Sequence, residues 1–132
     1  MKFIRIDKKE FWKSIPDAPG VYLIYSLGKK GFPKKIQRIL KLDENGVLYI
    51  GKSKNLRRRL IMLWRSLNRE YKTEAHVFAE KYNSNKRFRE RFPFDSLAIS
   101  YTKNNDPSNL EKKKIKKYII DLGEMPPFNS KL

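Results

Sequence analysis

Residues 47–60 carry the side chains best suited to binding a phosphate group. Positions 47–50 are apolar and β-prone, Gly51 follows them, and from Leu56 onward leucines recur at the spacing of one helical face. Cations crowd this junction and the helix after it, at Lys52, Lys54, Arg57, Arg58, Arg59 and, further on, Arg65. A strand that leads through a glycine turn into a basic helix is a place to hold a phosphate. The pattern by itself is not specific, so further chemistry must come from elsewhere in the chain.

Glu111 falls within residues 108–122, which we expect to form the last helix. At about 100° per residue, its carboxylate lies in the centre of an apolar stripe, in register with Ile115, Tyr118 and Leu122. A carboxylate in that position is costly to desolvate unless it meets a metal ion or another cation. The competing interpretation is a capping box from Ser108 to Glu111, in which the glutamate bonds back to its own helix start. The residues alone do not separate these two interpretations.

Arg59 raises a similar question on the earlier helix, where it falls at the edge of the leucine stripe. A half-buried guanidinium needs an anionic partner, which is either structural, with Glu111 as the candidate, or a substrate phosphate. The arginines Arg57, Arg58 and Arg65 are expected on the outward face, as a solvated or DNA-facing surface.

The simplest interpretation of two tyrosines and the single histidine is that they have structural roles. Tyr22 and Tyr49 lie on expected strands, where tyrosine most often packs in the core. His76 is expected on a helix surface or at a helix start, and we assign it no catalytic role. Because the chain has no cysteine and a single histidine, we do not expect a zinc site.

The elements that must position these residues are short, and the chain contains no internal repeat or low-complexity linker. Apolar and β-prone runs indicate strands at 3–6, 21–25, 47–50 and 97–102. Helical spacing and capping residues indicate helical segments at 8–14, 55–67, 74–82, 86–91 and 108–122. Residues 35–42 fit a helix or a strand equally well, and Asn45-Gly46 marks a hairpin-type turn after them.

The composition narrows the class of partner. A chain of 132 residues with 39% hydrophobic content is long enough for one domain with a core. Its formal net charge of +17 favours a polyanionic partner, nucleic acid first and an anionic membrane surface second. No stretch approaches the roughly 18 apolar residues of a membrane span, and no signal-peptide region opens the chain. We therefore expect an intracellular, cytoplasmic protein.

Several short motifs together resemble a known family. Gly20-Val21-Tyr22 and Tyr49-Ile50-Gly51 resemble the paired tripeptides that name the GIY-YIG nuclease superfamily. Residues 52–60 resemble the family's turn and first helix, with its arginine at Arg59. Leu110-Glu111 is similar to the start of the late helix that bears the family's metal-binding glutamate, and Pro127-Phe128-Asn129 to its closing motif. The resemblance extends over residues 18–132.

Two spacings depart from the family pattern. Tyr22 and Tyr49 lie 27 positions apart, further than is usual, which indicates an insertion around residues 26–46. The interval from Glu111 to Asn129 is also longer than usual, as if the last helix had gained a turn. Neither departure removes a chemical group, and the position of Asn129 is the detail most affected.

The resemblance implies a single α+β domain over residues 1–132, with a small three-stranded antiparallel sheet flanked by helices. It also implies a divalent-metal-dependent endonuclease that hydrolyses DNA phosphodiesters, with Mg²⁺ or Mn²⁺ as its cofactor. DNA is then the partner, with RNA as a second option and no role for a membrane. Because the chain has no room for a separate recognition domain, a protein partner that supplies specificity is a further option.

The resemblance also assigns roles to individual side chains. Glu111 would hold a single metal ion, and Arg59 would hold the scissile phosphate. Tyr22 would be the general base, its phenolate favoured by Lys52 and the metal. Tyr49 would hydrogen-bond the water or a phosphate oxygen, and the two tyrosines could exchange roles. The full implied set, in which Asn129 orients another member, is Tyr22, Tyr49, Lys52, Arg59, Glu111 and Asn129.

Two other interpretations stay open. The first is a non-catalytic nucleic-acid-binding module on the same fold. A degenerate copy of that kind usually lacks the glutamate or the arginine, and both are present here at Glu111 and Arg59. The second is a basic interaction protein that associates with a ribosome or a membrane surface, for which these residues would be bystanders.

Overall fold

An antiparallel sheet of four strands forms the centre of the molecule, in a computed structural model that describes residues 2–68 and 76–129. The strands lie in the order β1 (Ile4–Arg5), β6 (Leu97–Lys103), β2 (Gly20–Ser26) and β5 (Val47–Ser53). β2 runs between β5 and β6, and six of its seven residues are buried. Its position confirms that the continuous apolar run at 21–25 is a central strand.

The sheet has one strand more than the three that the family resemblance implies. β1 pairs with β6 at the edge, with Ile4 opposite Ile99. A backbone hydrogen bond of 3.0 Å from Ile6 N to Leu97 O continues this pairing. The N-terminal segment therefore supplies the fourth strand, while the broader prediction of an α+β fold with an antiparallel sheet and flanking helices is confirmed.

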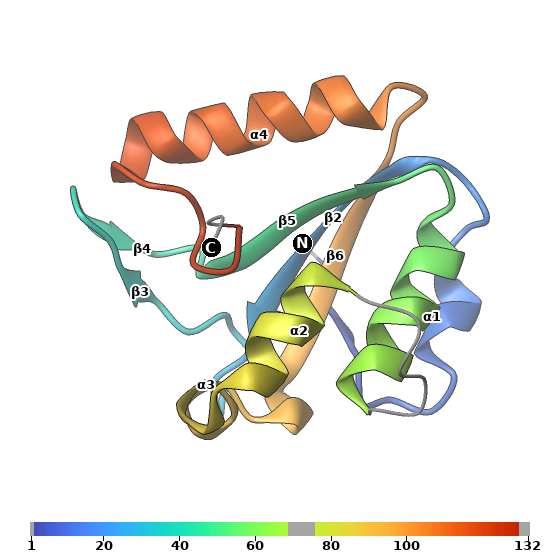
Figure 1. The fold of residues 1–132 in the computed structure, drawn as a ribbon, viewed down its shortest axis with the longest axis horizontal. Coiled ribbons are helices and arrows are strands. Elements are labelled where there is room, and N and C mark those ends of the chain that lie inside the picture. The colour runs from blue at the N-terminus through green and yellow to red at the C-terminus, as the bar shows by residue number, and fades with distance from the viewer. Residues whose placement is uncertain (1, 69–75, 130–132) are drawn as a thin grey trace.

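Helices cover both faces of the sheet (Figure 1). In the described ranges they are α1 (Leu56–Leu67), α2 (Val77–Ser84), α3 (Lys86–Arg91) and α4 (Pro107–Leu122), with two 3-10 helices, η1 (Phe11–Ser14) and η2 (Phe94–Ser96). One core forms where Tyr22 and Ile24 of β2 meet α1 and α2, and a second forms where Val21 and Tyr25 meet α4. Within the described ranges, no helix is both long and apolar enough to cross a membrane.

Local side-chain chemistry sets several helix ends. Asn55 caps α1 by accepting a hydrogen bond of 3.1 Å from Arg58 N. Gly123 ends α4 with a positive φ of 87°, which glycine adopts without strain. The helix expected at 74–82 begins at Val77 in the structure, and residues 74 and 75 lie outside the described ranges. The leucines of the α1 stripe are all buried, at Leu56, Leu60, Leu63 and Leu67.

The segment 26–46, expected as an insertion, contains a small hairpin of β3 (Ile36–Gln37) and β4 (Leu42–Asp43) (Figure 1). The undecided stretch at 35–42 is therefore strand, turn and strand. The hairpin tip is fixed to the end of α4, because Arg38 Nη2 lies 2.7 Å from Glu124 Oε1. A backbone bond of 3.1 Å from Leu40 N to Leu122 O adds to this contact.

Candidate active site

Tyr22 and Tyr49 lie on neighbouring strands and belong to the core on the α1 and α2 face of the sheet. Their ring centroids are 6.1 Å apart. Gly51 lies opposite Tyr22 in the β2–β5 ladder, and a Cβ atom there would stand 2.5 Å from Tyr22 Oη and 2.8 Å from Tyr49 Cε2. Position 51 must be glycine, because any side chain would displace the phenol that occupies this space.

His76 is the residue that the sequence interpretation missed. It is fully buried, and its Nε2 lies 2.6 Å from Tyr22 Oη. Its Nδ1 accepts a hydrogen bond of 3.1 Å from Phe78 N and so caps α2. The prediction of a helix start is confirmed and that of a helix surface is wrong. The sequence signal, a single histidine before an apolar helical run, indicates the cap and carries no information about Tyr22.

The two hydrogen bonds of His76 determine its tautomer. Burial, and then the positive charge of Arg59, lower the pKa of His76 from 6.5 to about 3, so the ring is neutral at ordinary pH and carries one N–H. Because Nδ1 accepts from Phe78 N, that proton must lie on Nε2. His76 Nε2–H therefore donates to the oxygen of Tyr22, and the proton of the phenol must point to another partner.

The phenol of Tyr22 is protonated in the protein alone. Burial raises its pKa well above the ordinary value of 10.0, and a negative charge on Tyr49 raises it further. Arg59 lowers this pKa through its charge and a hydrogen bond, whereas the charge of Glu111 raises it. Lys52, which we expected to favour the phenolate, is not among the groups acting on Tyr22; Arg59 is the cation that does so.

Arg59 is presented by the N-terminal half of α1 and is half-buried. Its Nη1 contacts the sulfur of Met62 at 3.1 Å, and its charge acts on Tyr22, Tyr49 and His76. In the part of the chain that the structure describes, no carboxylate lies within ion-pair distance of it. The structural interpretation, with Glu111 as its partner, therefore does not hold, and the guanidinium is available for an anion from outside.

Glu111 lies in the N-terminal part of α4 and is half-buried. The cap of this helix is Asp106, whose Oδ1 accepts from Asn109 N at 3.3 Å, so the capping box between Ser108 and Glu111 is wrong. Burial raises the pKa of Glu111, and the charges of Lys52 and Lys112 lower it. Among the described residues the carboxylate makes no hydrogen bond or ion pair that would offset its burial.

This carboxylate has the chemistry of a ligand for a hard divalent cation. Oxygen ligands suit Mg²⁺ and Mn²⁺, and a partly desolvated carboxylate without a partner gains most from an added positive charge. The described residues contain no group of three or more metal-binding side chains. A metal ion held by Glu111 would need oxygens of water and substrate as further ligands, because one carboxylate does not fill the coordination shell of such an ion.

Lys52 joins the end of β5 to the start of α4. Its Nζ donates to Ser108 Oγ at 3.0 Å, one turn before Glu111, and its side chain is exposed. Val21, its partner in the ladder, faces α4, so Lys52 lies on that face of the sheet. The structure connects Lys52 with the carboxylate of Glu111 and not with the phenol of Tyr22.

Asn129 contacts backbone and no other member of the expected set. Its Oδ1 accepts from Ile50 N and its Nδ2 donates to Ile50 O, both at 2.8 Å. β5 is an edge strand, so these two bonds satisfy the outward backbone groups that no further strand pairs. The side-chain amide of Asn129 fixes the backbone of Ile50, the residue between Tyr49 and Gly51. It thereby helps to hold the phenol of the neighbouring Tyr49 in place.

The expected nucleic-acid-binding residues differ in their surroundings. Lys54 and Arg58 are exposed, and Arg65 is half-buried. Arg57 is committed within the protein: its Nε donates to Ile15 O at 2.7 Å and its Nη1 lies 3.3 Å from Asp17 Oδ2. Arg57 therefore ties α1 to the segment after η1, and its replacement is expected to reduce stability before it affects a ligand.

Comparisons with protein-family models, with curated proteins and with solved structures find no match for this chain. What the site can do therefore follows from its own residues. They offer a guanidinium for an anion, a partly buried carboxylate for a cation, and two phenols for proton transfer or hydrogen bonding. These are the groups needed to hydrolyse a phosphodiester.

The tautomer of His76 predicts how stability depends on pH. Because its pKa is lower in the folded chain, about 3 against 6.5, the unfolded chain takes up the proton first as the pH falls. The free energy of unfolding should fall by about 2 kcal/mol between pH 7 and pH 5. In His76→Asn, which keeps an acceptor for the cap, this dependence should disappear. Urea denaturation at both pH values measures it, and an unchanged slope in the variant would contradict the assignment.

Proposed function

We propose that the protein is an endonuclease of the GIY-YIG type that hydrolyses DNA phosphodiesters with a divalent metal ion as cofactor. The observation that carries the proposal is that the charges of Arg59 and Glu111 both act on the phenols of Tyr22 and Tyr49, whose ring centroids are 6.1 Å apart. These four side chains come from β2, β5, α1 and α4, so the fold brings them together and local sequence does not. The order of the motifs and the α+β fold with its antiparallel sheet support the same proposal.

Arg59 and Glu111 would bind the reacting phosphate and the metal. A guanidinium with no carboxylate partner binds a phosphate through paired, charge-assisted hydrogen bonds. Glu111 would hold Mg²⁺ or Mn²⁺, and the ion would supply positive charge for the phosphoryl and leaving oxygens. Lys52 lies next to this carboxylate and adds positive charge on the same side.

Tyr22 is the proposed general base. Its phenolate is favoured by the donated hydrogen bond of His76 and by Arg59, and it is opposed by burial, by Tyr49 and by the charge of Glu111. Once the charge of Glu111 is neutralised, one of these opposing contributions disappears. The phenol can then take part in proton transfer nearer neutral pH. Tyr49, on the next strand, would hydrogen-bond the attacking water or a phosphate oxygen.

The raised pKa of Tyr22 favours one alternative, a nucleic-acid-binding module on the same fold that does not cleave. Such a module would use the +17 net charge of the chain and leave the buried phenol as a packing residue.

An assay on four substrates separates these functions. Supercoiled plasmid, linear duplex, single-stranded DNA and RNA are incubated with the protein in Mg²⁺, in Mn²⁺ and in excess chelator. We expect nicking of DNA in either metal and none in chelator, with products that carry a 5′-phosphate and a 3′-hydroxyl. Tight binding of nucleic acid without cleavage in any metal would overturn the nuclease proposal and leave the binding module.

A further inference from the structure

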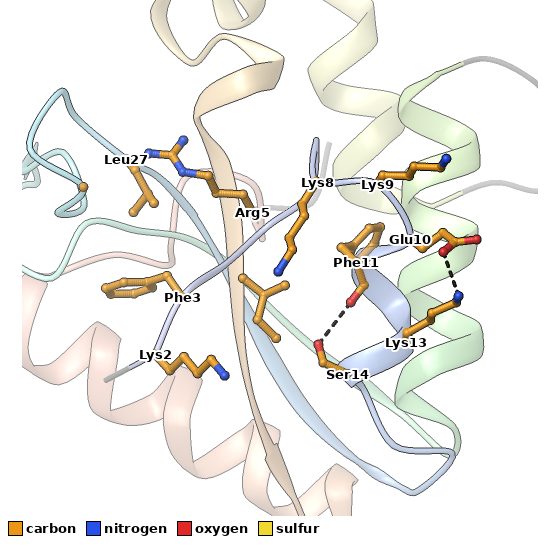
Figure 2. Close-up of a pocket in the computed structure, with 12 residues that line it drawn as sticks. Lys2, Phe3, Arg5, Lys8, Lys9, Glu10, Phe11, Lys13, Ser14 and Leu27 are labelled. Atoms are coloured by element: carbon orange, nitrogen blue, oxygen red, sulfur yellow. Dashed lines mark hydrogen bonds and ion pairs between the residues drawn. The ribbon is translucent and has the colours of Figure 1, made fainter.

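A basic hollow of about 680 Å³ lies along the edge of the sheet that is furthest from β5 (Figure 2). It is bounded by β1, by the segment after β1 and by η1. Its cations are Lys2, Arg5, Lys8, Lys9 and Lys13. With neighbouring strands about 4.8 Å apart, β1 lies about 14 Å from β5, so this hollow is separate from the site formed by Tyr49 and Glu111.

The positive charge of the hollow is largely uncompensated. Its single acidic side chain, Glu10, is paired with Lys13 at 2.7 Å. Arg5 Nη1 donates to Asp95 O at 2.9 Å, which fixes the guanidinium without neutralising it. Within the described ranges, the side chains of Lys2, Lys8 and Lys9 make no ion pair, hydrogen bond or ring contact. Figure 2 shows Lys8 extending into the space between Phe3 and Phe11.

The floor of the hollow is apolar and partly aromatic. Phe11 and Leu27 are buried beneath it, whereas Phe3 and Ile4 are only half-buried and present apolar surface to it. Phe3 is held edge-on to Tyr25 with ring centroids 4.9 Å apart, so its orientation is fixed by packing. Lysines around an exposed apolar and aromatic floor suit a ligand that carries both phosphates and flat ring faces.

A second hollow of about 400 Å³ continues the first along the open edge of β6. The two share Lys2, Ile4 and Ser14, and the second also includes Tyr101. The two hollows together form one groove. Tyr101, at the far end of the groove, is the ladder partner of Tyr22, the proposed base, so the groove ends one strand away from that residue. A chain lying in the groove would therefore lead toward the candidate active site.

We propose that this groove binds single-stranded nucleic acid. The bound segment would be the strand of the substrate that flanks the cleaved bond, and this second statement rests on the proposed function. The phosphates would contact Lys2, Lys8 and Lys9, and a base would lie on Phe3. A duplex stacks its base faces inside the helix and cannot offer them to an apolar floor. A single strand offers them freely, which is the reason for choosing it.

The test measures binding without cleavage, in the 132-residue chain carrying Glu111→Gln. Fluorescence anisotropy gives the affinity for a labelled single strand and for a duplex at several salt concentrations. The groove variant changes Lys2, Lys8 and Lys9 together to Gln. The matched control changes Lys113, Lys116 and Lys117 of α4, which are exposed helix positions, to Gln with the same loss of charge. Phe3→Leu tests the base contact, and circular dichroism confirms that each variant is folded.

We expect the groove variant to lose at least tenfold in affinity for the single strand and far less for the duplex. Its log–log salt slope should fall by about two, because roughly 0.7 counterions are released per phosphate contact on single strands. Phe3→Leu should lose about fivefold or more on the single strand and leave the salt slope unchanged. The control should weaken both ligands slightly and equally.

Three outcomes would overturn the proposal: equal losses in groove and control variants, an equal loss on duplex and single strand, or groove variants that lose binding to a poly-glutamate peptide while their nucleic-acid binding is unchanged. The last would identify an acidic protein as the occupant. Failure of the proposed function is a separate result. If the unmodified protein never cleaves DNA but the groove variants lose the single strand, the groove stands without the nuclease.

Discussion

Replacing Glu111 with glutamine should abolish the nicking of plasmid DNA and leave DNA binding as tight as before, or slightly tighter. Glutamine keeps the shape of the side chain and loses the only carboxylate that the described site offers to a metal ion. Metal ions contribute several kcal/mol to phosphoryl chemistry, so the rate should fall by about a thousandfold. Nicking is followed on a gel in Mg²⁺, and binding by anisotropy in parallel.

The control for this experiment is Asp121→Asn, which removes one negative charge from the other end of the same helix, at an exposed position. It should nick DNA at the rate of the unmodified protein. The thermal midpoint of Glu111→Gln should not fall, because the substitution removes a half-buried charge whose pKa is raised by burial. Full activity in Glu111→Gln, or loss of nicking in Asp121→Asn, would contradict the role of this carboxylate.

Replacing Tyr22 with phenylalanine should lower the nicking rate by a factor of about 10² to 10⁴, the usual contribution of a general base. The change deletes the oxygen that receives the His76 hydrogen bond and leaves Nε2–H buried without a partner. We therefore also expect the free energy of unfolding to fall by about 1–3 kcal/mol. Single-turnover rates, measured well below the thermal midpoint, separate the two effects.

Tyr25→Phe is the matched control for this second experiment. Tyr25 is a buried tyrosine on the same strand whose hydroxyl bonds to Ser100 Oγ at 3.1 Å, on the face covered by α4. Its loss should cost similar stability and leave nicking unchanged. A covalent DNA adduct on Tyr22 or Tyr49 would replace the general base with direct attack by a phenol. Equal losses of activity in both variants would mean that Tyr22 acts through packing alone.

Much of the secondary structure could be read from the chain because it depends on neighbours in sequence. The leucine spacing and the Asn55 cap predict α1, and the apolar run around Val21 predicts a buried central strand. The glycine at position 123 predicts the end of α4 in the same way. In each case the determining contact spans a few residues, so a local pattern contains the information.

Candidate side chains for the site could be proposed from the chain, with the exception of His76, but the contacts between them could not. His76 meets Tyr22 across 54 residues, and Asn129 meets Ile50 across 79. No periodicity records such pairs, since they arise only when helices pack on the sheet. The same holds for the raised pKa of Tyr22, because burial depends on what covers a side chain and not on its neighbours in sequence.

Two corrections show the same division between local and tertiary information. A helical wheel places Arg57 on the outward face, yet the packing of η1 against α1 brings Ile15 O within 2.7 Å of its Nε. Ser108 and Glu111 have the spacing of a capping box, yet the helix begins earlier, at an Asp106 cap, so Glu111 lies beyond the first turn. The sequence alone determined which groups are present and on which elements. Tertiary packing decided which of them are buried, which are paired, and which remain available to a ligand.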